Sequence, residues 1–197
     1  MLAPGFADPV LASQAVFRSV MDAMARPGTI IATSGLAHAP RPLSSAAAAV
    51  TLTLFDFETP MWLDPALAQS GEVVSWLRFH TGAPLTDDPQ RAAFGLIADP
   101  SKMPQLAAFS QGSMEYPDRA TTLVVQVECL SNDRGLWLSG PGIKGSRALF
   151  ASPLPADFVA RMRANRALFP RGVDIILAAG EMLAALPRSA HVAAELA

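Results

Sequence analysis

The sequence TTLVVQVEC, residues 121–129, decides the fold class, because it is a mostly apolar, β-branched run that predicts a buried strand. Residues 173–177 (VDIIL) form a similar run downstream. Residues 182–186 predict a further strand across the turn at Gly180-Glu181. The remaining predicted strands are shorter and comprise residues 29–31, 61–63, 94–97 and 136–138.

Helical patterns alternate with these strands. Residues 13–25 predict a helix that ends before Pro27-Gly28. Residues 46–54, after a Ser44-Ser45 cap, suit a helix, although their β-branched residues also suit a strand. The apolar face predicted for the first helix comprises Phe17, Val20, Met21 and Met24. The other predicted helices comprise residues 72–79, 103–109 and 155–167. This alternation predicts one α/β domain over residues 1–197, with helices on the faces of a sheet.

The composition excludes several classes of protein. Hydrophobic residues make up 51% of the 197 and charged residues 16%, which excludes a disordered or fibrous chain. A net charge of −2 provides no positive field, so we expect neither a nucleic acid nor a membrane partner. The longest apolar run, residues 46–55, is about half the length of a membrane span. The apolar excess predicts burial against another subunit, most simply in a homodimer.

Cys129 is the only cysteine, which excludes an internal disulfide. Its place at the end of an apolar run predicts a buried, unreactive thiol. The first six residues, MLAPGF, lack the basic and apolar regions of a signal peptide. Together these features predict a cytoplasmic protein.

Residues 140–145, GPGIKG, match the spacing of a dinucleotide-binding loop and are called the glycine turn below. A dinucleotide loop needs a helix directly after it, whereas Pro153 and Pro155 soon interrupt the chain here. Lys144 precedes Gly145, which also excludes the phosphate-binding loop of nucleotide triphosphatases. The glycine turn therefore predicts a backbone-shaping turn, with anion binding as the alternative.

Basic residues at the ends of elements are the other candidates. The three histidines, His38, His80 and His191, show no metal-ligand spacing, so no metal is expected. His80 suits the negative end of a helix dipole. The two lysines, Lys102 and Lys144, lie in turn-rich segments that would not activate a Schiff base. Arg26 and Arg188 each lie where a predicted element ends. An arginine at such a position can form a surface ion pair or bind an oxyanion, and both interpretations stay open. The candidate anion-binding residues are Arg26, His80, Gly140, Gly142 and Arg188.

Seven short motifs occur in order along the chain. They are residues 17–18 (FR) with 21–28 (MDAMARPG), 54–60 (LFDFETP), 79–82 (FHTG), 116–119 (YPDR), 138–143 (LSGPGI), 172–174 (GVD) and 186–188 (LPR). They extend from Phe17-Arg18 to Arg188 and so cover almost the whole chain. Together they resemble the PhnH family of the bacterial carbon–phosphorus lyase system.

The resemblance implies a three-layer α/β/α sandwich with a mixed sheet, similar to pyridoxal-phosphate-dependent transferases but without that cofactor. It also implies a subunit that works with other carbon–phosphorus lyase subunits. Their first step would form α-D-ribose 1-methylphosphonate 5-triphosphate from ATP and methylphosphonate with release of adenine. No catalytic residue is transferred by the resemblance, so a structural or substrate-shaping role is expected. The alternative hypothesis is a stand-alone α/β enzyme, or a binding module, for a phosphorylated ligand at the glycine turn.

Overall fold

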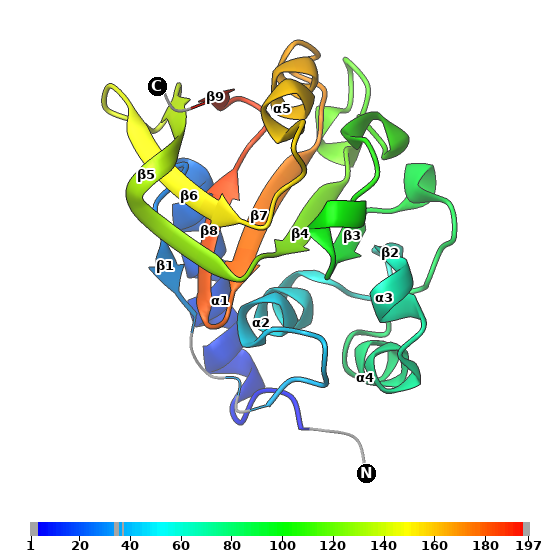
Figure 1. The fold of residues 1–197 in the computed structure, drawn as a ribbon. Coiled ribbons are helices and arrows are strands. Elements are labelled where there is room, and N and C mark those ends of the chain that lie inside the picture. Colours follow the sequence, from blue (N-terminus) through cyan, green and yellow to red (C-terminus); the bar gives the residue numbers. More distant parts are fainter. Residues whose placement is uncertain (1–3, 34–35, 37, 195–197) are drawn as a thin grey trace.

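Six strands form the central sheet of the computed structural model, which describes residues 4–33, 36 and 38–194 (Figure 1). These strands are β1 (Ile31–Ala32), β2 (Met61–Leu63), β3 (Phe94–Ile97), β4 (Thr122–Gln126), β7 (Asp174–Ala179) and β8 (Met182–Leu186). Their order is β1-β8-β7-β4-β3-β2. The four strands from β7 to β2 are parallel, whereas β8 is antiparallel to both of its neighbours.

All α-helices except the last begin after a residue whose side chain accepts a free N–H group of the first turn. Asp8, Ser44, Asp64 and Ser70 cap the first four helices in this way. Gly82, with φ of 69°, ends the fourth, as expected for a left-handed cap. The helices are α1 (Pro9–Ala25), α2 (Ser45–Leu54), α3 (Pro65–Ala68), α4 (Gly71–Thr81) and α5 (Phe158–Arg166). The 3₁₀ turns are η1 (Pro89–Arg91), η2 (Pro100–Lys102), η3 (Leu106–Ala108) and η4 (Pro117–Arg119). Among the described residues, no helix has the length and apolarity needed to cross a bilayer.

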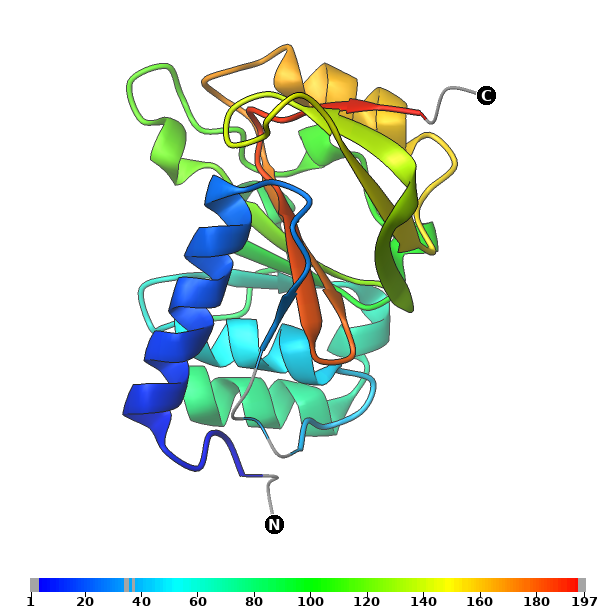
Figure 2. The same cartoon turned by 90° about the vertical axis from the view of Figure 1, so that its left-hand side faces the viewer.

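Alternate residues of the central strands face two separate cores. On one face, side chains such as Val124 and Ile176 pack with α1, α2 and α4. On the other, neighbours such as Val125 and Ile175 pack with α5 and with a second, smaller sheet. Figure 2 shows α1 and the other helices of the first face on one side of the central sheet, with the smaller sheet on the other.

The smaller sheet is antiparallel and contains β5 (Cys129–Ser139), β6 (Arg147–Ser152) and β9 (His191–Ala193), in the order β6-β5-β9. The α/β class and the mixed sheet are confirmed. The second outer layer differs from the predicted helical one, because this sheet shares it with α5. Neither β6 nor β9 was predicted, since both alternate partly exposed residues with few buried ones and depend on pairing with the distant β5.

The predicted apolar face of α1 is partly wrong. Phe17 is 48% exposed and Met21 52% exposed, whereas the buried residues are Val16, Val20 and Ala23. The small side chains face inward because α1 packs against α2, whose buried residues 46–49 are all alanine. Close helix approach therefore outweighs the burial of two large side chains.

The predicted burial of Cys129 is also wrong, because the thiol-bearing residue is exposed. Strand β4 ends at Gln126, earlier than the predicted residue 129, and Cys129 begins β5 after the chain has left the core. The short helix predicted at residues 103–109 is reduced to the single 3₁₀ turn η3.

The exposed position of Cys129 gives a first testable expectation. We expect the folded chain to react with a thiol-specific disulfide reagent at one equivalent per chain without denaturant, because the reagent can reach an exposed thiol directly. A Cys129→Ser variant is the blank. Reaction that begins only in denaturant would contradict the exposed placement.

Candidate functional site

The glycine turn connects β5 to β6 and has the geometry of a type II turn. Pro141 is at its second position, Gly142 at its third has φ of 80°, and the Ile143 N–H donates to the Gly140 carbonyl oxygen at 3.2 Å. A strand follows the turn instead of a helix. The turn therefore lacks the helix N-terminus on which a dinucleotide loop depends.

The glycine turn packs against the end of α1. A Cβ at Gly142 would lie 2.0 Å from the Ala25 carbonyl oxygen, a distance that no real contact allows. Nη1 of Arg147 donates to the carbonyl oxygens of Arg26 and Pro27 at 3.1 and 2.9 Å, and also contacts Oγ1 of Thr29. The motif that ends at Gly28 is thereby attached to the β5–β6 hairpin.

Arg147 and Asn132 are the residues of this contact that the sequence does not single out. Nδ2 of Asn132 donates to the Gly28 carbonyl oxygen at 2.9 Å. The sequence gives only a general indication of this contact, because carbonyl groups just past any helix end need hydrogen-bond donors. It does not indicate which side chains, more than a hundred residues away, supply them.

Arg26 itself extends away from this contact. Its guanidinium forms an ion pair of 3.0 Å with Asp22, and the two side chains are 54% and 61% exposed. This is the surface ion pair expected as the alternative to anion binding, and such pairs contribute little to stability.

Arg188 occupies a junction of three motifs, called the Arg188 junction below. Its Nη2 lies 2.5 Å from Oδ2 of Asp174, and Nε also donates to that carboxylate. Its Nη1 donates to the carbonyl oxygens of Pro117 at 2.5 Å and Pro170 at 3.4 Å. The two charged side chains are only 14% and 19% exposed, so Arg188 holds the loops before β4 and β7 to the end of β8.

The glycine turn also lies beside the segment after Arg188, since a Cβ at Gly140 would be 3.3 Å from the Ser189 carbonyl oxygen. Four of the five predicted anion-binding residues, Arg26, Gly140, Gly142 and Arg188, therefore belong to one end of the molecule. Anion binding by these four residues stays a prediction. Arg188 already pairs with Asp174, and the Cβ positions of Gly140 and Gly142 lie next to backbone atoms.

His80 lies apart from the other four. It is in the last turn of α4, with its ring 4.8 Å from that of Trp76 and 5.0 Å from that of Phe79. Figure 2 shows α4 at the opposite end of the molecule from the glycine turn. The five residues therefore do not form one site.

The carboxyl ends of the parallel strands are where α/β proteins usually bind ligands. Here Asp64 follows β2, and its buried carboxylate accepts N–H groups from Leu67, Ala98 and Asp99, each at 2.9 Å. Three backbone donors satisfy this charge without a ligand. Asp64 is therefore a structural residue that ties β2 to the end of β3.

The N-terminus of α2 meets the same edge, and the N–H groups of Ser44, Ala46 and Ala47 are satisfied within the chain. The Ser44 N–H donates to Oε1 of Gln126 at 2.5 Å, and Oγ of Ser44 accepts the Ala47 N–H at 3.2 Å. The Ala46 N–H donates to the Gly180 carbonyl oxygen at 2.8 Å. These contacts occupy the groups that bind phosphates in related α/β arrangements.

A cavity of about 300 Å³ beside this helix start has an acidic lining that includes Asp99 and Glu128. Hydrogen bonds from Ser101 and then Lys102 lower the pKa of Asp99, which favours its charged form. Lys102 offsets the charge of Asp99 in an ion pair of 3.0 Å, so the remaining charge of the lining is that of Glu128, which would repel an anion. This edge therefore suits a phosphate or phosphonate poorly.

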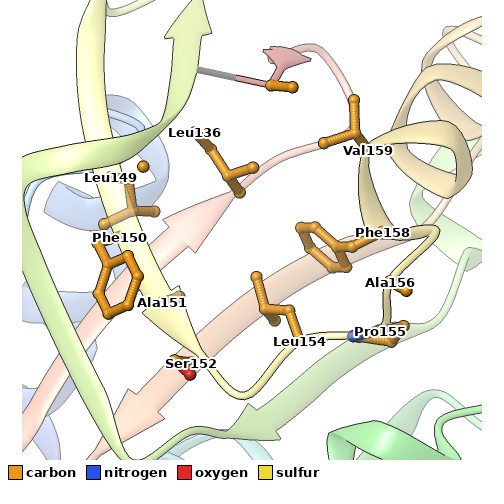
Figure 3. A pocket seen from close by; sticks show the side chains of 12 residues that line it. Leu136, Leu149, Phe150, Ala151, Ser152, Leu154, Pro155, Ala156, Phe158 and Val159 are labelled. Carbon is orange, nitrogen blue, oxygen red and sulfur yellow. The ribbon is translucent and has the colours of Figure 1, made fainter. Parts of the chain in front are cut away.

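A cavity of about 370 Å³ lies between the smaller sheet and α5 (Figure 3). Leu136, Leu149, Leu154 and Phe158 point into it, and Ser152 is at its margin. Such a lining offers apolar contact area to a ligand but no side chain that could act as an acid or a base. No group of three or more His, Cys, Asp or Glu suited to a metal occurs in the part of the chain that the structure describes.

Comparison with known proteins places these contacts in a family. Residues 4–193 match the family model described as bacterial phosphonate metabolism protein (PhnH). A curated relative from Rhizobium meliloti (strain 1021), alpha-D-ribose 1-methylphosphonate 5-triphosphate synthase subunit PhnH, is 46% identical over 190 residues, which are 96% of this chain and 94% of the relative. The putative C-P lyase subunit protein HtxG of Stutzerimonas stutzeri is 30% identical over 179 residues, 91% of this chain and 85% of the relative.

The matched region contains both cores, the glycine turn and the Arg188 junction, so the resemblance carried by the seven motifs extends to the whole described architecture. The chain belongs to the PhnH family of bacterial phosphonate metabolism proteins.

Proposed function

We propose that this chain is the PhnH-type subunit of an α-D-ribose 1-methylphosphonate 5-triphosphate synthase. The observation that carries the proposal is the 46% identity to a relative of that name over 96% of the chain. In the proposed reaction a phosphonate oxygen of methylphosphonate forms a bond to C1′ of the ATP ribose. The bond from C1′ to the base breaks, and its electron pair leaves with adenine, which takes up a proton.

We propose further that the subunit acts as a scaffold or shapes the substrate site, with the reacting groups on partner subunits. Two contacts support this role. Arg188 uses its guanidinium on Asp174 and on two carbonyl oxygens, and Gly142 contacts the end of α1. The family motifs at these positions thus make contacts within the chain, which favours a structural role for them over direct contact with substrate.

The proposed partners are other carbon–phosphorus lyase subunits, and a second copy of the chain in a homodimer when it is alone. Exposed apolar side chains of α1 support burial against another chain: Val10 is 77%, Phe17 48% and Met21 52% exposed. Sedimentation at micromolar concentration tests the homodimer, which a monomer would exclude. The single free thiol, Cys129, is compatible with the proposed cytoplasmic location.

We propose that residues 1–197 act as one domain related in fold to pyridoxal-phosphate-dependent transferases and work without that cofactor. The lysine environments support this: the Lys102 side chain is 77% exposed and paired with Asp99 at 3.0 Å, and Lys144 is exposed in the glycine turn. Neither has the apolar surroundings that activate a Schiff-base lysine. A visible absorbance band lost on borohydride treatment would contradict the proposal.

Growth on a single phosphorus source tests the function in cells. Deleting the gene in its own host should abolish growth on methylphosphonate and leave growth on inorganic phosphate unchanged. Restoring the chain should restore growth, whereas an empty vector should not. Unimpaired growth of the deletion strain on methylphosphonate would refute the proposed function.

A further inference from the structure

Strand β2 lies at the edge of the central sheet, next to α3 and α4 (Figure 1). On its inner side, the Pro60 carbonyl oxygen accepts an N–H of β3 at 3.2 Å, and the Asp64 N–H donates to a carbonyl oxygen of β3 at 3.0 Å. The backbone groups of successive strand residues point to alternate sides. Those of Met61 and Leu63 therefore point to the outer side of the strand, away from β3.

The outer side is covered at Met61 by residues 84–86, which run parallel to the strand there. The Met61 N–H donates to this segment at 2.8 Å, and the Met61 carbonyl oxygen accepts an N–H from it at 3.0 Å. If the pairing continued, the Asp88 N–H would donate to the Leu63 carbonyl oxygen. It donates instead to Oγ1 of Thr86 at 3.2 Å, in a local turn that ends the pairing. The segment therefore leaves the strand before it reaches Leu63.

The backbone N–H and carbonyl oxygen of Leu63 consequently have no hydrogen-bond partner among the residues that the structure describes. Leu63 is only 7% exposed, and nearly all buried backbone groups are paired with protein or with water. In an extended residue the two groups point the same way, so Leu63 offers a donor beside an acceptor. Their missing partner is a molecule that offers an acceptor beside a donor.

A cavity of about 340 Å³ lies at this edge of β2 and is called the β2 cavity below. Trp62 and Leu63 pack in the cores on opposite faces of the central sheet, yet both line the β2 cavity. Leu85 and Thr86, from the segment that covers Met61, line it as well. A space that touches both faces of the strand and the segment beyond it lies along the strand edge, where the free Leu63 groups point.

The rest of the lining restricts the kind of ligand. Pro65, Ala68 and Val74 add apolar surface, and Asp87 is the only charged residue among the described residues that line the β2 cavity. Without a basic side chain the cavity suits a phosphate or phosphonate poorly. An added β-strand would pair with several residues, whereas only Leu63 has free groups. The β2 cavity therefore suits a small, flat, uncharged molecule that can pack against the Trp62 indole.

We propose that the β2 cavity binds adenine, either as the base of ATP or as the released base. The Leu63 N–H would donate to the ring nitrogen beside the exocyclic amino group, and the Leu63 carbonyl oxygen would accept a hydrogen bond from that amino group. The faces of the base would contact Trp62 and the apolar residues of α3 and α4. The site is inferred from the free backbone groups and the cavity, whereas the choice of adenine rests on the proposed function.

Nuclear magnetic resonance titration of the isotope-labelled chain tests the site, with adenine, ATP and purine as the probes. We expect adenine, ATP or both to shift the Leu63 amide proton saturably and to slow its exchange with solvent, because the N–H gains an acceptor. Purine lacks the amino group, so it should bind at least about fivefold more weakly than adenine. Binding of adenine without ATP identifies the released base as the ligand, and binding of ATP identifies the nucleotide. Either result supports the site.

Ala68→Phe should weaken this binding at least about tenfold, because the new side chain would occupy part of the β2 cavity. Ala66→Phe is the matched control: it makes the same change on the same helix, at a residue that does not line the cavity. It should leave the affinity within about twofold. Both alanines are exposed, so both variants should melt close to the temperature of the unmodified chain.

Three results would overturn the site. They are an unchanged Leu63 amide with every probe, purine binding as tight as that of adenine, and equal losses in the two variants. The first would assign the free Leu63 groups to ordered water. The growth test does not depend on these titrations. Growth that requires the chain without adenine binding would refute the site alone, and adenine binding without a growth requirement would refute the proposed function alone.

Discussion

Gly142→Ala should destabilise the folded chain by about 3 kcal/mol, through left-handed strain and overpacking together. The φ of 80° accounts for roughly 1–2 kcal/mol of this effect. The remainder comes from the 2.0 Å approach of the new Cβ to the Ala25 carbonyl oxygen, which requires the hairpin to move away from α1. Denaturant unfolding followed by circular dichroism measures the loss.

Gly145→Ala is the matched control, because it lies in the same turn with φ of 73° and has no atom within 4 Å of its Cβ position. It should show the strain alone, roughly 1–2 kcal/mol. Equal losses in the two variants would contradict the contact with α1. A Gly142→Ala variant with unchanged stability and weakened binding of phosphorylated ligands would favour the alternative hypothesis, in which the glycine turn is a ligand site.

Arg188→Gln should be at least as damaging, with a loss of about 3–5 kcal/mol, because it leaves the mostly buried Asp174 carboxylate without its partner. It also removes the donor shared by the Pro117 and Pro170 carbonyl oxygens. The loops before β4 and β7 should therefore loosen together, which hydrogen exchange would detect as faster exchange in both.

Arg26→Gln is the control for Arg188→Gln, since it breaks an exposed ion pair with Asp22. Its effect should stay below about 1 kcal/mol. If Arg188→Gln left stability unchanged and removed ligand binding, Arg188 would be a ligand-binding residue and the structural account of the Arg188 junction would fail.

Local patterns predict the central sheet well where a strand is buried on both faces. The apolar runs at residues 61–63 and 94–97 coincide with β2 and β3, and Gly82 ends α4 as expected. In the smaller sheet, the predicted strand at residues 136–138 lies within β5. Strands β6 and β9 are partly exposed, so their sequences lack that signal and their existence depends on pairing with β5. The inward face of α1 is likewise determined by the alanines of α2, which its own periodicity does not reveal.

The candidate site shows the same limit. The sequence identifies Arg26, Gly142 and Arg188 because each stands at a turn or an element end. Their partners lie far away in the chain, for example the Ala25 carbonyl oxygen for Gly142. Asn132 and Arg147, which donate to the carbonyl oxygens that follow α1, become visible only when all neighbours are placed.

Adenine release from ATP and methylphosphonate by purified carbon–phosphorus lyase subunits tests the proposed function most directly. The complete set of subunits should release adenine, and release should fall to the background rate when this chain is left out. The chain alone should also stay at background. Equal release with and without the chain, or release by the isolated chain above background, would contradict its role as a required, non-autonomous subunit.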